Sequence, residues 1–420
     1  MAIIKSCHVT LNMDINQKLY EQKHQYFLYS IFKRACLIRL VNCLIFSTIL
    51  MLISSCNQTV NNGNEGSTPL KSIKIGIFLP TNHKDPLVRK KAIQYLKAAK
   101  LAIDDLRPIN LELILYETDG LQENIILRAQ EAINNDIDIA VGTMVDEETM
   151  VLSSFLKNSG IKLFSFSDQS SYLGKNTFHM AIGKVNLAEQ ILDYLMDIGY
   201  QKFLILEGLT DTEVISQNEL TKLVYNKKGK IARYLKIKEN SESLQVMKNS
   251  IGIFRSSPEK EAIIILGFPD QNMIFALASL KASLGEDRGE RIQVVGLTRW
   301  SIEQKLLVEP ALEKAWFPFL NKQRFKEFSE RYQKKYGIKP SLESTIAYDS
   351  IAAIGALVKT AENNNTRYPF TFSAITNPSG FYGVLGTFRL RKDGLSERLM
   401  GVGESLDSQI YILKKPATKF

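Results

Sequence analysis

Cysteine is missing from most of this chain of 420 residues. All four cysteines fall within the first 56 residues, at Cys7, Cys36, Cys43 and Cys56. The rest of the chain therefore has no disulfide, no thiolate nucleophile and no thiolate metal ligand. Histidine is almost as scarce, since His83 and His179 are the only two beyond residue 56. This count excludes a metal site built from several histidines.

A strong charge of one sign is also missing from the main part of the chain. The formal net charge is +9, and residues 1–56 hold six Lys or Arg against Asp14 and Glu21, which is +4 of that total. The remaining surplus is too small to predict a nucleic-acid surface, so no nucleic-acid partner is expected. With 45% hydrophobic residues the chain can bury a large core, and its length suits two domains.

Motifs for catalysis are missing as well. Gly380, Gly383 and Gly386 are not followed by Gly-Lys-Ser/Thr, so they predict tight turns rather than a phosphate-binding loop. No pair of carboxylates has the sequence context of an acid–base pair. We therefore predict that the protein is not an enzyme and uses neither a cofactor nor a metal.

Residues 1–56 have the features of a secretory leader. Lys33, Arg34 and Arg39 precede the apolar segment 40–53, which is short for a membrane span and suits the apolar region of a signal peptide. The segment ends Leu-Ile-Ser-Ser-Cys, which resembles the lipobox of bacterial lipoproteins. The resemblance implies cleavage before Cys56 and attachment of a diacylglyceryl group to its sulfur, so that a lipid anchor holds the protein at a membrane.

The residues after Cys56 bear on where that anchor would lie. Asn57, rather than Asp, follows the cysteine, which favours the outer membrane over the inner membrane. Residues 57–70 are polar and hold Gly63 and Gly66, which predicts a flexible tether between the lipid and the folded body.

The body begins with a regular alternation of strands and helices. Short apolar runs predict strands, and apolar residues at helical spacing predict the helices between them. The expected strands are 73–79, 111–116, 138–141 and 161–166. The expected helices are 86–106, 121–134 and 146–157. This order predicts a parallel sheet with right-handed crossovers.

A second cycle of the same kind starts after residue 178. Its expected helices are 185–199, 213–226, 243–255 and 269–284. Its expected strands are 203–207, 230–237, 262–267 and 292–297. The whole chain is therefore predicted to have an α/β fold with two doubly wound parallel sheets.

Two polar turns follow neighbouring strands of the first cycle. Thr143–Glu148 follows one strand and the serine-rich turn Ser165–Ser171 begins at the end of the next. Ligands of open α/β sheets bind beyond the carboxyl ends of the strands, so these turns predict a site for a small polar ligand. An ordinary serine-rich turn without a ligand is the alternative.

The order of the segments and their residue sequences resemble those of the type I periplasmic-binding fold. The matching segments are IKIGIFLP, ELILYETDG, DIAVGTMVDEE, GIKLFSFSDQSS, the helix that contains Ala347-Tyr348-Asp349, and the glycine-rich hairpin 380–388. The resemblance implies two lobes joined by a hinge, with chain crossings near residues 183, 317 and 380. Lobe 1 would hold residues 71–182 and 318–380, and lobe 2 residues 183–317 and 381–420.

Two subfamilies with this fold fit the sequence. The phrases IGIFLP, VGTMVDEET and GIKLFSFSDQSS look more like the lipoprotein activators of penicillin-binding proteins, which stimulate peptidoglycan synthesis. The alternative is the receptor of an ABC importer for branched-chain or other amino acids, whose partner is a permease. A structural lipoprotein of the envelope is the third class that the sequence leaves open.

The resemblance also implies candidate ligand-binding residues. From the first lobe they are Thr143, Asp146, Glu147, Ser165, Ser167, Asp168 and Ser170. From the second lobe they are Asp211 and Asp270, which equally well cap the helices that follow them. Hydroxyl and carboxylate groups of this kind would hold the charged ends of an amino acid or small peptide.

Overall fold

The computed structural model describes most of the chain after the leader. The described residues are 72–167, 176–208, 215–237, 260–284, 292–298, 300, 304–320 and 322–420. Cys56, Asp168, Ser170, Asp211 and the helix expected at 243–255 lie outside them. Residues 1–69 and 70–420 form two separate units, and all described residues belong to the second. Among the described residues, no helix has the length and apolar character that a membrane crossing requires.

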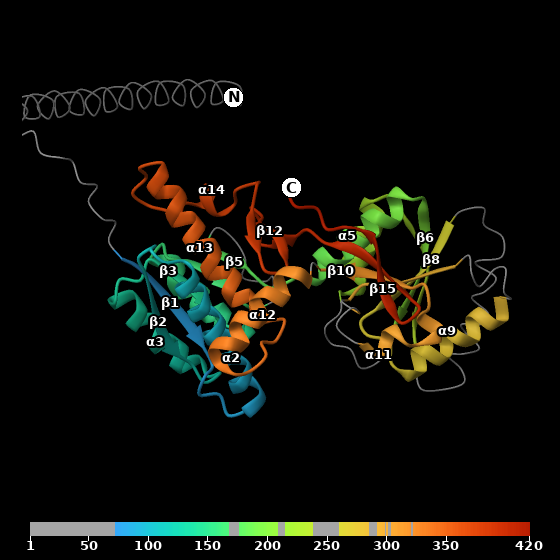
Figure 1. Cartoon of the computed structure of the whole chain (residues 1–420), viewed down its shortest axis with the longest axis horizontal. Helices are drawn as coiled ribbons and strands as arrows, with labels where there is room; N and C mark the ends of the chain where they lie inside the picture. Colours follow the sequence, from blue (N-terminus) through green and yellow to red (C-terminus); the bar gives the residue numbers. More distant parts are fainter. Residues whose placement is uncertain are drawn as a thin grey trace, which may run out of the picture. The chain divides into compact units, whose positions relative to one another are not determined.

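The first half of the body forms a five-stranded parallel sheet with the strand order β2-β1-β3-β4-β5 (Figure 1). The strands are β1 (Ile73–Leu79), β2 (Leu111–Glu117), β3 (Ile139–Gly142), β4 (Lys162–Ser165) and β5 (Thr177–His179). Alternate residues of β1 enter different cores, since Ile77 packs on one face and Phe78 on the other. A sheet covered on both faces needs strands that are apolar throughout, which explains the continuous apolar runs in the sequence.

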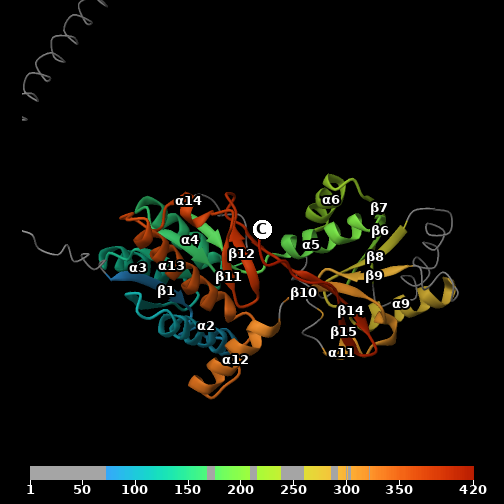
Figure 2. The ribbon, with the colours of Figure 1, turned by 45° about the horizontal axis from the view of Figure 1, so that its top comes forward.

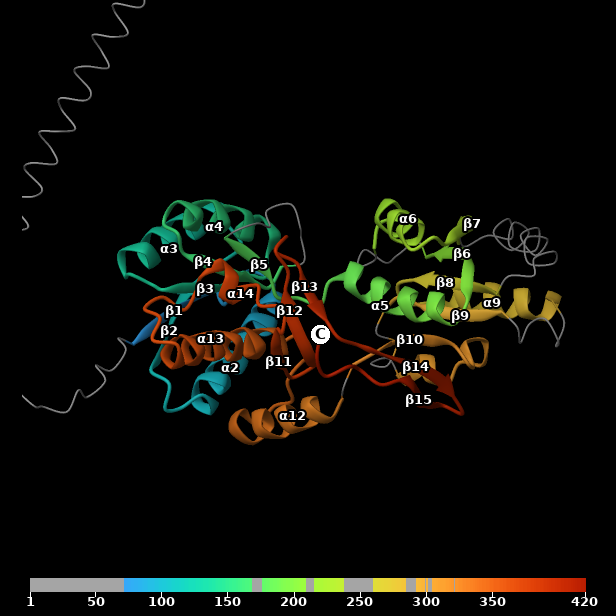
Figure 3. The ribbon, with the colours of Figure 1, turned by 90° about the horizontal axis from the view of Figure 1, so that it is seen from above.

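Helices cover both faces of this sheet, as Figures 2 and 3 show. α2 (Pro86–Asp105) and α13 (Thr345–Asn363) pack against each other over one face. α3 (Gln122–Asn134) and α4 (Asp146–Asn158) cover the other. The start of α2 follows the local sequence, because the Asp85 carboxylate accepts the N–H of Leu87 at 2.8 Å and Pro86 lies in the first turn. α12 (Lys322–Tyr336), which the sequence analysis did not predict, also packs on α2.

The second half of the body forms a seven-stranded sheet with the order β15-β14-β10-β9-β8-β6-β7. The strands are β6 (Tyr200–Glu207), β7 (Lys230–Lys236), β8 (Lys260–Leu266), β9 (Gln293–Gly296), β10 (Trp316–Phe319), β14 (Gly401–Leu406) and β15 (Gln409–Lys414). β6 to β10 pair in parallel, whereas β14 and β15 add an antiparallel hairpin. The α/β fold with two parallel sheets is therefore confirmed, and the hairpin is an addition that was not predicted.

The helices of the second half again lie on two faces of their sheet. α5 (Lys184–Asp197) and α6 (Gln217–Asn226) belong to one core. α9 (Gln271–Leu284) and α11 (Gln304–Leu307) belong to the other, together with the short helix Pro310–Leu312. α6 begins with a capping box, in which Ser216 and Glu219 satisfy each other's backbone N–H groups.

A third, three-stranded sheet lies after α13 and the short helix α14 (Phe372–Ile375). It consists of β11 (Phe381–Gly383), β12 (Gly386–Leu390) and β13 (Ser396–Arg398). Phe381, Phe388 and Met400 are buried in the core of the first sheet. The chain therefore crosses into the second sheet after Met400, whereas the sequence analysis placed this crossing near residue 380.

Candidate functional site

The carboxyl ends of the first-sheet strands carry linked polar turns. After β1, the Thr81 hydroxyl donates to the Glu117 carboxylate at 2.9 Å, and the Asn82 amide donates to its second oxygen at 3.3 Å. Glu117 is the last residue of β2, the neighbour of β1 in the sheet. The turns after β1 and β2 are therefore held together at one edge of the sheet.

The turn after β3 starts at a glycine that no other residue could replace without a shift of the backbone. Gly142 has φ +103°, and a Cβ placed on it would lie 2.2 Å from the carbonyl oxygen of Phe78. Thr143 follows and is fully buried. Its hydroxyl lies 2.5 Å from the Thr149 hydroxyl and donates to the carbonyl of Val145 at 3.0 Å. This predicted ligand-binding hydroxyl is thus engaged inside its own turn.

The turn after β4 contacts the turn after β3. Ser165 is buried, and its hydroxyl oxygen accepts the N–H of Ser167 at 3.2 Å. The Ser167 hydroxyl donates to the Asp146 carboxylate. The N–H of Phe166 donates to the carbonyl of Thr143 at 3.1 Å. The structure therefore brings Thr143, Asp146, Ser165 and Ser167 together.

The first turn of α4 separates an exposed glutamate from a buried one. Glu147, which the sequence analysis selected, is exposed. Glu148 is buried and accepts from the Thr118 hydroxyl at 3.0 Å and the Gly120 N–H at 2.9 Å. Burial raises the pKa of the Glu148 carboxyl despite these two hydrogen bonds. Its spacing from Leu152 and Leu156, four and eight residues on, was the signal for a buried position.

Asp270 has the role of a helix cap. Its carboxylate accepts the N–H of Met273 at 2.8 Å at the start of α9. This is the alternative that the sequence analysis gave for the aspartate beside that of a ligand contact. Asp270 therefore contributes to the start of the helix.

The carboxyl edge of the first sheet is acidic. Five carboxylates lie on its turns and on the first turn of α4: Glu117, Asp119, Asp146, Glu147 and Glu148. Asp119 and Asp146 are partly exposed, and Glu117 and Glu147 are exposed. Two arginines at this edge bond backbone carbonyls: Arg89 of α2 donates to His83 at 2.9 Å, and Arg128 of α3 donates to Glu117 at 3.2 Å. An edge with this charge attracts a cationic group.

A small cavity lies at the carboxyl edge of the second sheet. It measures about 20 Å³ and follows the ends of β8 and β9. Lys184 and Thr298 are among its lining residues, and the Thr298 hydroxyl donates to the carbonyl of Gly267 at 3.0 Å. This volume holds roughly one water molecule, so the cavity alone does not admit an amino acid.

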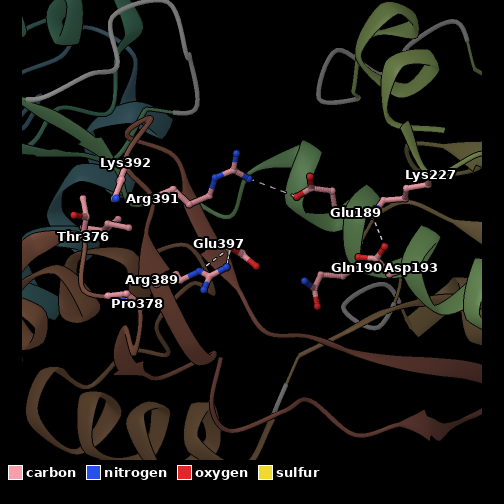
Figure 4. A pocket seen from close by; sticks show the side chains of 11 residues that line it. Glu189, Gln190, Asp193, Lys227, Thr376, Pro378, Arg389, Arg391, Lys392 and Glu397 are labelled. Atoms are coloured by element: carbon pink, nitrogen blue, oxygen red, sulfur yellow. Dashed lines mark hydrogen bonds and ion pairs between the residues drawn. The ribbon is translucent and has the colours of Figure 1, made fainter. Parts of the chain in front are cut away.

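A larger cavity of about 430 Å³ lies between α5 and the hairpin β12–β13 (Figure 4). Its charged lining residues are Glu189, Asp193, Lys227, Arg389, Arg391, Lys392 and Glu397. Arg389 pairs with Glu397 at 2.7 Å, Lys227 pairs with Asp193, and Arg391 reaches Glu189 at 3.8 Å. Burial raises the pKa of Glu189. Most of these charges already compensate one another, so the lining carries little net charge for a ligand.

A buried ion pair fixes the three-stranded sheet β11–β13 to α13. The Asp349 carboxylate accepts from the Arg398 guanidinium at 2.9 Å and from the Val384 N–H at 2.7 Å. Arg398 also donates to the carbonyl of Gly386 at 3.1 Å. The sequence analysis quoted Asp349 as part of a helix motif but did not pair it, because its partner lies 49 residues away.

Comparison with known proteins identifies related sequences and structures. A family model described as "Periplasmic binding protein" matches residues 73–408. No curated protein is detectably similar in sequence. Many solved structures share the fold, and the similar regions cover most of this chain.

Three of these structures come from ABC transport systems. A Rhodospirillum rubrum protein provisionally assigned as a branched-chain amino acid ABC transporter has a TM-score of 0.66 at 16% identity, over 82% of this chain and 100% of that one. A branched-chain amino acid ABC transporter periplasmic ligand-binding protein of Burkholderia xenovorans has a TM-score of 0.57 at 12% identity, over 82% and 96%. A Desulfitobacterium hafniense ABC transporter substrate-binding protein in complex with Leu has a TM-score of 0.54 at 17% identity, over 82% of this chain and 100% of that one.

These matches confirm the type I periplasmic-binding fold that the sequence predicted. The family and these structural relatives are binding proteins. They support the importer receptor, which the sequence analysis gave as its alternative, better than the activator of a penicillin-binding protein, which it preferred.

Proposed function

Because the chain belongs to the periplasmic binding protein family, we propose that it is the substrate-binding receptor of an ABC importer for a ligand with an amino group. The observation that carries the proposal is the acidic carboxyl edge of the first sheet, where Asp146 and Ser167 meet. An amino acid or a small peptide has the ammonium group that such an edge would bind. Its partner in transport would be the permease.

Asp146 is the residue best placed to bind the ammonium group. It is partly exposed, begins α4 and contacts the turn after β4 through Ser167. Glu147 lies next to it and is exposed, so it would add negative charge without a fixed position. Thr143 and Ser165 are buried and would hold the turns in place rather than contact the ligand. A charged group fixed by a second residue binds an opposite charge with less loss of entropy than a mobile one.

The second sheet offers groups for the other end of the ligand. Lys184 at the start of α5 and Thr298 after β9 line the small cavity at its carboxyl edge. We propose that the ligand's carboxylate binds on this side, and that binding to both sheets favours the closed form of the hinge. The asymmetry between an acidic first edge and a lysine on the second suits a zwitterion.

The family implies a periplasmic location, and we propose that a lipid on Cys56 anchors the protein there. The tether of residues 57–70 would span at most about 50 Å when fully extended. Such a length lets the body reach a partner near the membrane that holds the anchor. Asn57 favours the outer membrane, whereas a permease partner favours the inner membrane.

One observation favours the activator of a penicillin-binding protein as a second candidate. The hydroxyls of Thr143 and Ser165, which the amino-acid receptor was expected to use, are buried and engaged within their own turns. A cleft without ligand would be consistent with a protein that works by docking a synthase. In that case amino acids and short peptides would not raise the thermal stability of the protein.

The test is a thermal-stability screen of the full chain in mild detergent against the amino acids and short peptides. A ligand at about 100 times its Kd should stabilise the protein by roughly 2.7 kcal/mol. Asp146→Asn should reduce the affinity for that ligand at least tenfold, because it removes the charge opposite the ammonium group. Glu112→Gln is the matched control, since Glu112 is exposed at the amino end of β2, the opposite edge of the sheet. A screen without any response, together with recovery of a penicillin-binding protein by pull-down, would favour the activator.

A further inference from the structure

The two edges of the seven-stranded sheet differ in chemistry. β7 forms one edge, and its exposed residues are Lys230, Arg233 and Lys236. β15 forms the other edge; Gln409 and Lys414 are exposed at its two ends, and between them the exposed side chains are the apolar Tyr411, Ile412 and Leu413, at 46%, 48% and 38%. Charged side chains on an edge strand prevent it from pairing with another chain, whereas apolar side chains favour such pairing. β15 lies at the outer side of the hairpin in Figure 3.

The turn between β14 and β15 decides which backbone groups of β15 point outward. Asp407 and Ser408 have φ +52° and +60°, which is typical of a two-residue type I′ turn. The pair Leu406–Gln409 therefore closes the hairpin with hydrogen bonds, and the pattern alternates along the strand. The N–H and C=O groups of Tyr411 face β14, while those of Ile410 and Ile412 face away from it.

No element of the described chain covers these outward groups. Within the residues that the structure describes, no backbone hydrogen bond from outside the hairpin reaches Ile410 or Ile412. Both residues therefore present a donor and an acceptor at the edge of the sheet. An exposed edge with these groups adds a further strand readily.

We propose that β15 binds β15 of a second copy of this chain, antiparallel and around a two-fold axis at Tyr411. Ile410 then lies opposite the partner's Ile412, and Ile412 opposite the partner's Ile410. Each of these two pairs exchanges both of its backbone hydrogen bonds, because all four residues point outward. The two seven-stranded sheets become one continuous sheet, and the contact is isologous.

The backbone selects this register, because only an axis at Tyr411 pairs the outward residues Ile410 and Ile412 with each other on both sides of the axis. In this register the turn residue Asp407 comes near the end of the partner's β15, where Lys415 follows the bulged strand, and the same charges meet on the other side of the axis. Asp407 and Lys415 are both exposed. An axis at Ile410 or Ile412 also matches the backbone pattern, but it pairs one of these residues with itself and leaves the other opposite the turn or the residues beyond the bulge.

The side chains at the centre fit the same arrangement. Tyr411 lies opposite the partner's Tyr411, and aromatic pairs on neighbouring strands stabilise a sheet. The bulge between Val402 and Gly403 displaces Leu413 from the regular ladder, so the shared ladder is short. A dimer that dissociates on dilution is therefore expected.

The first test measures the mass of the full chain by sedimentation velocity in mild detergent, from about 1 µM to about 1 mM. We expect twice the monomer mass at high concentration. Ile412→Pro removes the outward N–H and no bond to β14, so the hairpin is kept and the dimer is lost. Lys91→Glu, a charge reversal at an exposed position of α2, is the control and should dimerise as the natural chain does.

The second test is a charge exchange. Lys415→Glu brings like charges near each other twice and should weaken the dimer at least about tenfold. Adding Asp407→Lys should restore the attraction, and lysine tolerates a positive φ in this chain at Lys228 and Lys314. Circular dichroism checks that each variant is folded. A monomer at every concentration, an unchanged dimer with Ile412→Pro, or no rescue by the exchange would each overturn the proposal.

Discussion

The buried pair of Asp349 and Arg398 gives the sharpest prediction about stability. Asp349 is 1% exposed and Arg398 is 3% exposed, and the two join α13 to the hairpin β11–β13. Asp349→Ala leaves the guanidinium buried with the Gly386 carbonyl and the Phe388 ring as its remaining described contacts. It also leaves the Val384 N–H without the acceptor seen in the structure.

The expected cost follows from these contacts. Removing one partner of a buried ion pair costs about 3–5 kcal/mol of unfolding free energy, because the other charge stays buried. Asp349→Asn should cost roughly 1–3 kcal/mol less, since the amide oxygen can still accept the Val384 N–H. Replacing both residues, as Asp349→Ala with Arg398→Met, should cost clearly less than the sum of the two single changes.

Urea unfolding followed by circular dichroism measures these free energies. Asp393→Ala is the control, because Asp393 pairs with Arg391 and accepts the Leu395 N–H at the surface, where the two contacts together should contribute no more than about 2 kcal/mol. The reasoning is refuted if Asp349→Ala destabilises the protein no more than Asp393→Ala does. Equal costs for the double change and the summed single changes would show that the two charges are not coupled.

Two further predictions concern pH and membrane attachment. Burial raises the pKa of Glu148, so the folded state binds its proton more tightly than the unfolded state, and stability falls as the pH rises from the ordinary pKa of a glutamic acid to the raised one. Glu148→Gln should flatten this part of the pH profile, because glutamine does not titrate, and its amide can still donate to Thr118 and accept from Gly120. Thermal unfolding from pH 4 to 8 checks this, and an unchanged slope would contradict it. Cys56→Ser should move the protein from the membrane fraction to the soluble fraction, and fractionation of outer and inner membranes locates the natural chain; retention of the variant in the membrane would argue against the lipid anchor.

The local sequence was enough to predict the strand and helix order of the first half. Apolar runs such as Ile73–Leu79 and helical spacing such as that of Asp146–Asn158 are local patterns, and the structure has these elements within a residue or two of the predicted ends. Because parallel strands end at a common edge, the sequence also predicted that the turns after β3 and β4 meet, as the contact of Ser167 with Asp146 shows.

Burial and contacts that involve residues far apart in the sequence were decided by the tertiary structure alone. The side of α4 that faces the core determines that Glu148 is buried while Glu147 is exposed. The three-stranded sheet β11–β13 belongs to the first core because Phe388 packs there, and no local pattern in the sequence predicts that packing.

The sequence by itself thus determined the alternation of elements and the polar character of the strand ends, because both follow from the spacing of neighbouring residues. Only the tertiary structure decided that Asp349 pairs with Arg398, that the Thr143 hydroxyl is engaged within its own turn, and that β15 is left as an apolar edge. These contacts depend on how distant segments pack. The free energy of burial is a sum over the whole core, so it does not follow from the residue at any one position.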